Sequence, residues 1–155
     1  MRIGFVVNPI AGMGGRVGLK GTDGKVAEAR RRGAEPRAPD RARRALEALS
    51  DRFGSVGAGE ADAGTGLDVL TWDGAMGADA ARAAGFEPTV LGAADGDDTS
   101  AADTERAVAA FVEADVDLVV FVGGDGTAGD VAAAVEGTGT PILGVPAGVK
   151  VYSSV

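Results

Sequence analysis

Two patterns of hydrophobic and polar positions follow one another along the chain. Short runs rich in Val, Ile, Leu and Phe are typical of strands, whereas apolar residues spaced three and four apart are typical of helices. The runs predict strands at 2–8, 67–72, 87–91, 117–122 and 142–145. The helical spacing predicts helices at 25–32, 39–53, 78–85, 101–112 and 128–135. This order predicts an α/β fold: a doubly wound, mainly parallel sheet of about five strands with helices on both faces.

The stretch at 117–127 is the most informative, because five consecutive apolar residues run there into Gly-Gly-Asp-Gly-Thr. An unbroken apolar run is typical of a parallel strand that is covered on both faces. The turn then lies at the carboxyl end of a central strand, where open α/β sheets bind ligands. Its three glycines let backbone N–H groups approach an anion closely, and the following helix start offers more donors. Asp125 is the one ionisable group in this turn.

A second glycine-rich stretch, at 9–24, follows the first strand and is predicted to be a long loop. Arg16 and Lys20 could reach phosphate oxygens from it. The alternative is a mobile surface loop with solvated charges. Further along, the helix at 39–53 has one apolar stripe, which we expect to be buried: Ala42, Ala45, Leu46, Leu49 and Phe53.

Length and composition limit the chemistry. The 155 residues predict one domain, and the absence of Cys and His excludes thiol nucleophiles, His bases and Cys/His zinc sites. A net charge of -8 argues against nucleic acids and anionic membranes as partners. Because we find no signal peptide and no long apolar run, we expect a cytoplasmic protein. The sequence has many acids but only three lysines, which suggests a salt-adapted protein. This hypothesis predicts that the folded state is more stable in molar salt than in low salt.

Three other charged or turn features favour ordinary explanations. Seven arginines lie between residues 30 and 44, and we interpret them as a solvated helix face, with contact to a polyphosphate or an acidic partner as the alternative. The acids at 95–98 lack the ligand spacing of an EF-hand and are expected to form a solvated turn. Asp73 and Met76 follow a strand and could line a ligand crevice, but turn and core roles are favoured.

Three motifs together resemble the NAD kinase superfamily, which also contains diacylglycerol and sphingosine kinases. They are Val-Val-Asn-Pro-Ile-Ala-Gly-Met-Gly-Gly at 6–15, Gly-Gly-Asp-Gly-Thr at 123–127 and Gly-Val-Pro-Ala-Gly-Val-Lys at 144–150. Residues 8–15 together with 18–24 are similar to the archaeal-type ATP-NAD kinases. The resemblance covers 1–155 but only as an amino-terminal, nucleotide-binding domain. The family's second, β-rich domain is missing, so we expect an isolated domain or a truncated product.

The resemblance implies a phosphotransferase that uses ATP and Mg²⁺ to phosphorylate the 2′-hydroxyl of NAD. It implies that Asp125 is the carboxylate beside the attacking hydroxyl, with helix capping as the alternative role. Contacts to phosphates or ribose are implied for Asn8, Gly12, Gly14, Lys20, Gly123, Gly124, Gly126, Thr127 and Lys150. Asp130 is expected to hold Mg²⁺ or, alternatively, to offset the positive end of its helix.

One departure from the family and several alternatives remain open. Gly129 stands where archaeal-type relatives commonly have Arg and lipid kinases have Asn, which removes one phosphate contact. The alternatives to an NAD kinase are a related kinase with a lipid or small-molecule acceptor and a nucleotide-binding module without catalysis. The donor, ATP or polyphosphate, is not fixed by the sequence. Because the superfamily commonly forms dimers or tetramers, the resemblance also implies a homo-oligomer.

Overall fold

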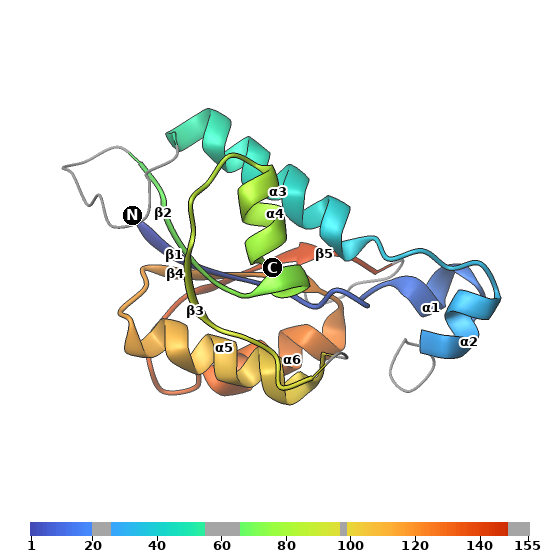
Figure 1. Ribbon diagram of the computed structural model, residues 1–155. Helices are drawn as coiled ribbons and strands as arrows, with labels where there is room; N and C mark the ends of the chain where they lie inside the picture. Colours follow the sequence, from blue (N-terminus) through green and yellow to red (C-terminus); the bar gives the residue numbers. More distant parts are fainter. Residues whose placement is uncertain (20–25, 55–65, 97–98, 149–155) are drawn as a thin grey trace.

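The computed structural model describes residues 1–19, 26–54, 66–96 and 99–148. Within them, five parallel strands form one sheet in the order β3-β2-β1-β4-β5 (Figure 1). The strands are β1 (Arg2–Val7), β2 (Asp68–Trp72), β3 (Thr89–Gly92), β4 (Leu118–Gly123) and β5 (Ile142–Pro146). All four pairings are parallel, which confirms the predicted α/β fold.

The strand β3 begins two residues later than the sequence pattern predicts. Pro88 precedes it and has no N–H group to donate to a neighbouring strand, so pairing starts at Thr89. The strand lies at one edge of the sheet, and Val90 and Leu91 are 37% and 36% exposed. The prediction of a short third strand is confirmed, and its bounds shift towards the carboxyl side.

Four helices cover the two faces of the sheet (Figure 1). They are α3 (Ala38–Phe53) and α4 (Ala78–Ala83) on one face, and α5 (Ala101–Glu113) and α6 (Asp125–Ala134) on the other. Each pair of helices shares a separate hydrophobic core with the sheet. Helices therefore cover both faces, as the doubly wound fold requires.

Alternate residues of β1 serve the two cores. Ile3, Phe5 and Val7 pack in the core beneath α3 and α4, whereas Val6 packs with α5 and α6. All four side chains are at most 1% exposed. This two-sided burial explains why the central strands appear in the sequence as continuous apolar runs.

Three short elements complete the described structure: α1 (Met13–Arg16), α2 (Val26–Arg31) and the 3-10 helix η1 (Gly74–Met76). The helix α2 was predicted, but α1 corrects the prediction of an uninterrupted loop at 9–24. Gly12, with a φ of 81°, turns the chain into α1. Met13 is fully buried, and this burial anchors a helical turn that its two glycines would not predict.

Two predicted helical stripes are only partly buried. In α3, Ala42 and Leu46 are fully buried, but Phe53, in the last turn, is 45% exposed. In α6, Ala128 and Val131 are buried, whereas Ala132 is exposed. The last turn of α3 extends beyond the buried part of the helix. In α6, Val131, Ala134 and Val135 pack against the core on either side of Ala132, so Ala132 lies on the solvent side of the helix. No helix in the described ranges is long and apolar enough to cross a bilayer.

The absence of a side chain at Gly4 is a packing requirement that mutation can test. A Cβ atom at this central position of β1 would lie 2.5 Å from the ring of Phe111 in α5. We therefore expect Gly4→Ala to lower the free energy of unfolding by about 1–3 kcal/mol through overpacking. Urea unfolding measures this cost. In a Phe111→Leu background the cost of Gly4→Ala should shrink, and an unchanged cost there would contradict the packing argument.

Candidate functional site

The order of the strands locates the candidate site. From β1 the chain moves outward on one side through β2 to β3, and then crosses to β4 on the other side of β1. The direction of winding thus reverses between β1 and β4. Open α/β sheets bind ligands at the carboxyl ends of the strands beside such a switch point. Asn8 follows β1 there, and Gly124 follows β4.

A side-chain hydrogen bond joins the ends of these two strands. Asn8 Nδ2 donates to Thr127 Oγ1 at 3.0 Å, and Asn8 Oδ1 accepts from the backbone N–H of Ile10 at 3.3 Å. The Asn8 N–H also donates to the carbonyl of Val122 at 2.9 Å, which extends the sheet ladder by one residue. Asn8 therefore fixes the loop after β1 to the first turn of α6.

The loop after β5 closes the same edge. The Ala147 N–H donates to the carbonyl of Gly123 at 2.9 Å. Gly12 lies so near that a Cβ atom on it would be 2.0 Å from the carbonyl oxygen of Ala147, and its φ of 81° also favours glycine. The loops after β1, β4 and β5 thus contact one another. We call this assembly, residues 8–12, 123–127 and 146–148, the rim.

Asp125 is the first residue of α6, and its side chain is exposed. The N-cap of α6 is Gly124, which has no side chain to cap with. The alternative interpretation of Asp125 as an N-cap residue is therefore wrong, although an acid in the first turn still interacts favourably with the helix dipole. The structure presents this carboxylate at the switch point.

The glycines of the turn differ in their surroundings. A Cβ atom on Gly123 would lie 2.4 Å from the Thr127 side chain, so Gly123 is needed for packing. Gly124 and Gly126 have no atom within 4 Å of that position. The φ of Gly124 is -111°, which any residue can adopt, so conformation does not require glycine there. These two positions leave open space through which a ligand can approach the backbone.

The start of α6 supplies backbone donors to that space. The first intrahelical bond runs from the Ala128 N–H to the carbonyl of Gly124 at 2.9 Å. The N–H groups of the preceding helical residues point out of the helix end, where anions bind favourably. Thr127 itself is only 4% exposed and is engaged by Asn8, so its hydroxyl orients the turn. Contact between a ligand and Thr127 stays a prediction.

Asp130 lies in the second turn of α6 and is partly exposed. Because α6 begins at Asp125 and not at Ala128, Asp130 lies farther from the positive helix end than the sequence implied. The dipole alternative is correspondingly weaker, since that effect fades within the first turn. In the described ranges, no three acids lie close enough together to hold a metal ion by themselves.

The remaining predicted residues divide into three groups. Gly14 is buried within α1, where its carbonyl accepts from the N–H groups of Val17 and Leu19. Lys20 and Lys150 lie outside the described residues. Met76 is 1% exposed and belongs to the core, which is the role that the sequence analysis favoured. Asp73 is exposed.

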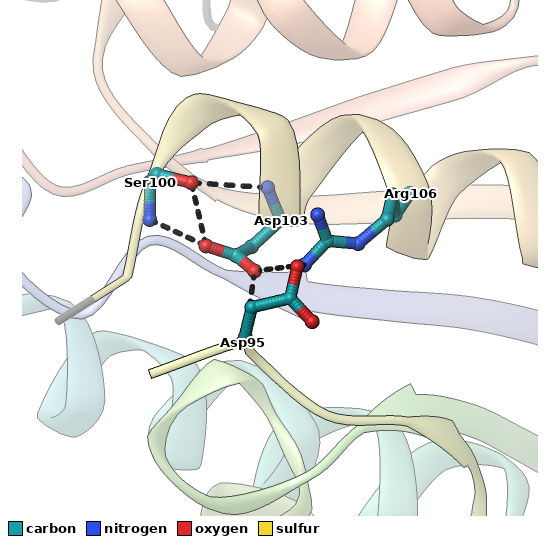
Figure 2. A network of polar contacts seen from close by, with 4 residues as sticks. All are labelled: Asp95, Ser100, Asp103 and Arg106. Carbon is teal, nitrogen blue, oxygen red and sulfur yellow. Dashed lines mark hydrogen bonds and ion pairs between the residues drawn. The ribbon is translucent and has the colours of Figure 1, made fainter. Parts of the chain in front are cut away.

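A buried carboxylate at the start of α5 was not recognised in the sequence. Asp103 is 3% exposed and accepts hydrogen bonds from the Ser100 N–H at 2.8 Å and the Ser100 hydroxyl at 2.6 Å (Figure 2). It also accepts from the Asp95 N–H at 3.3 Å and from Arg106, which pairs with the Asp95 carboxylate at 2.8 Å. The signal that reveals this network in the sequence is Ser100-x-x-Asp103, a capping box.

This network joins Asp95, which follows β3, to the start of α5, and Ser100 is the N-cap of that helix. Hydrogen bonds from the Ser100 hydroxyl, the main cause, hold the pKa of Asp103 below its usual value, although burial opposes this shift. Every described contact of Asp103 is with its own loop or helix. We therefore assign it a structural role.

The lowered pKa of Asp103 predicts a particular dependence of stability on pH. A carboxyl with a lower pKa in the folded state stabilises the fold above its unfolded pKa, about 4, and this contribution disappears as pH falls through the folded value. Asp103→Asn should therefore lower the free energy of unfolding at pH 7 by about 1–3 kcal/mol and flatten its decline below pH 4. Urea unfolding across this range measures both. The exposed Asp79→Asn is the control, and equal slopes in the three proteins would contradict the assignment.

Comparisons with known proteins agree with these observations. A family model described as "ATP-NAD kinase N-terminal domain" matches residues 3–155. No curated protein and no solved structure matches the chain. The match covers nearly the whole sequence and includes the rim motifs that carried the predicted resemblance. The chain therefore belongs to the family of ATP-NAD kinase N-terminal domains.

Proposed function

We propose that an enzyme built on this domain transfers the γ-phosphoryl group of ATP to the 2′-hydroxyl of the adenosine ribose of NAD, which yields NADP. The observation that carries the proposal is the exposed carboxylate of Asp125 at the switch point, between two glycines with open surroundings. Family membership supports a kinase with nucleotide substrates. The family model describes an amino-terminal domain, so for the chain itself we propose nucleotide binding.

The geometry of the rim fits the demands of phosphoryl transfer. This reaction requires mainly positioning and compensation of charge, with little covalent participation of the protein. Backbone N–H groups near Gly124 and Gly126 would bind phosphate oxygens. The ribose hydroxyl oxygen would form the new P–O bond and pass its proton to Asp125, while the bond between the γ-phosphorus and ADP breaks. A base in this position contributes on the order of 10²–10⁴ in rate.

Mg²⁺ is part of the proposal. Proteins commonly hold this ion through one or two carboxylates plus the phosphates of the substrate, and it neutralises charge on the transferred group. This mode uses one or two carboxylates, and α6 carries Asp125 in the rim and Asp130 in the next turn. Asp130 is the carboxylate that we propose for this contact. Asn8, Gly12 and Gly14 would shape the donor site, and Lys20 and Lys150 would add phosphate contacts.

The proposal places the enzyme in a salt-adapted cytoplasm, in agreement with its net charge of -8. NAD is the acceptor that the family favours. Supplying diacylglycerol or sphingosine in vesicles in place of NAD would reveal a lipid kinase instead. The direct test of the proposed reaction is incubation with ATP, Mg²⁺ and NAD, with chromatography to measure the NADP that forms.

Replacement of Asp125 tests its role as the base. In the enzyme that contains this domain, Asp125→Asn should lower kcat at least 10²-fold, because the amide cannot accept the proton. The KM for ATP should change little, since the backbone donors remain. NADP formation at saturating substrate measures kcat, and circular dichroism checks that the fold is retained.

Asp51→Asn is the matched control, because it removes an exposed acid from the far end of α3. It should leave kcat within twofold of the unmodified enzyme. A loss of only about twofold in Asp125→Asn would return Asp125 to a purely electrostatic role in the first helical turn and would contradict the proposed mechanism.

Replacement of Gly124 tests the approach of phosphate to the backbone. The backbone angles and open surroundings of Gly124 accommodate alanine, so Gly124→Ala should not lower the thermal midpoint. A bound phosphate would meet the added methyl group, and we expect ATP affinity to fall about tenfold or more, which calorimetry measures. Gly96→Ala, at another open glycine, is the control. Equal ATP affinities in both variants would mean that the turn faces no ligand.

A further inference from the structure

The arginines around the start of α3 form an island of positive charge. Seven arginines and two acids, Glu35 and Asp40, lie between residues 30 and 44, which gives a net charge of +5. The whole chain carries -8, so the remainder carries -13. A segment so unlike the rest of the protein needs an explanation beyond solubility, because a uniformly acidic surface already provides that.

Four of the seven arginines are explained by ion pairs with acids three or four residues away in the sequence. Arg31 and Arg32 share Glu28, at 2.5 and 2.7 Å. Arg43 contacts Asp40 at 3.0 Å and also Glu47, and Arg44 contacts Asp40 at 3.0 Å. These pairs fit the interpretation of a solvated helix face.

Arg30, Arg37 and Arg41 have no ion pair among the described residues. Arg37 is the N-cap of α3, and the Arg41 N–H donates to its carbonyl at 3.0 Å, so the two side chains lie one turn apart on the same flank. Positive charges at the positive end of a helix destabilise it, as do like charges spaced i and i+4. The fold therefore gains nothing from the charges of Arg37 and Arg41.

These two arginines begin the helix beside the rim. Ala38, the residue after Arg37, is fully buried in the same core cluster as Ala11 and Ala147, which belong to the loops after β1 and β5. Figure 1 shows the start of α3 at the end of the sheet where β1 and β5 finish. The first turn of α3 therefore lies at the same end of the sheet as the rim.

We propose that Arg37 and Arg41 bind the phosphate chain of ATP at the rim. The inference rests on the proposed function, because it assumes that the rim is the donor site. The planar guanidinium group donates two hydrogen bonds to phosphate oxygens, which makes it the side chain best suited to this ligand. A bound phosphate chain would also offset the repulsion between the two arginines and between each arginine and the helix end.

Calorimetry on the 155-residue chain tests the proposal with MgATP, tripolyphosphate and NAD as separate ligands. Arg37→Ala and Arg41→Ala should each weaken MgATP and tripolyphosphate binding about tenfold and leave NAD binding within twofold. Arg41→Lys should lose less than Arg41→Ala, because it keeps the charge but not the planar fork. Neither alanine variant should have a lower thermal midpoint, since each removes an unfavourable charge.

Arg52→Ala is the matched control, because it removes an exposed arginine from the last turn of the same helix. It should leave all three affinities unchanged. Tight MgATP binding by the unmodified chain with unchanged affinity in Arg37→Ala and Arg41→Ala would overturn this inference alone. The same holds if the two variants lose NAD binding instead of MgATP binding. Failure of the unmodified chain to bind either MgATP or tripolyphosphate would overturn the proposed nucleotide site as well.

Discussion

The parallel pairing of β1 with β4 is the constraint on which the candidate site depends. Its register sets Val7 beside Val122, so both strands end at the same level. Asn8 then lies close enough to Thr127 for its side chain to bond the first turn of α6. The chain reverses its direction of winding between these two strands. A space for a ligand therefore follows from topology before any particular side chain is considered.

The sequence predicts those features that depend on neighbouring residues. The apolar run 118–122 identifies a strand buried on both faces, because only such a strand excludes polar residues from both of its sides. The glycines after it mark a turn, and Ser100 marks a helix start, since both signals reside in residues a few positions apart.

Features that depend on distant residues could not be predicted in this way. The bond between Asn8 and Thr127 joins positions 119 apart, and the close contact of Gly12 with Ala147 exists only after β5 has taken its place beside β4. A strand pattern indicates burial but does not identify the neighbouring strand, so the order of the sheet was not predicted. The exposure of Phe53 has the same origin, because the apolar stripe of α3 continues beyond the part of the helix that packs on the sheet. The three motifs of the family resemblance follow β1, β4 and β5, and the structure brings these loops into contact.

Two acids in the first turns of helices show how environment separates structural from chemical roles. Asp103 in α5 is buried, and hydrogen bonds from its own loop and helix keep it ionised by lowering its pKa. A proton acceptor held in this way is a poor base, because protonation would break the bonds that stabilise the fold. Asp125 in α6 is exposed, and its neighbours Gly124 and Gly126 have no atom within 4 Å of the position that a Cβ would take. Both acids benefit from the helix dipole, so their positions in the helices do not distinguish them. Exposure to solvent does, and of these two acids Asp125 is the exposed one, so it is the acid that we propose for contact with a sugar hydroxyl.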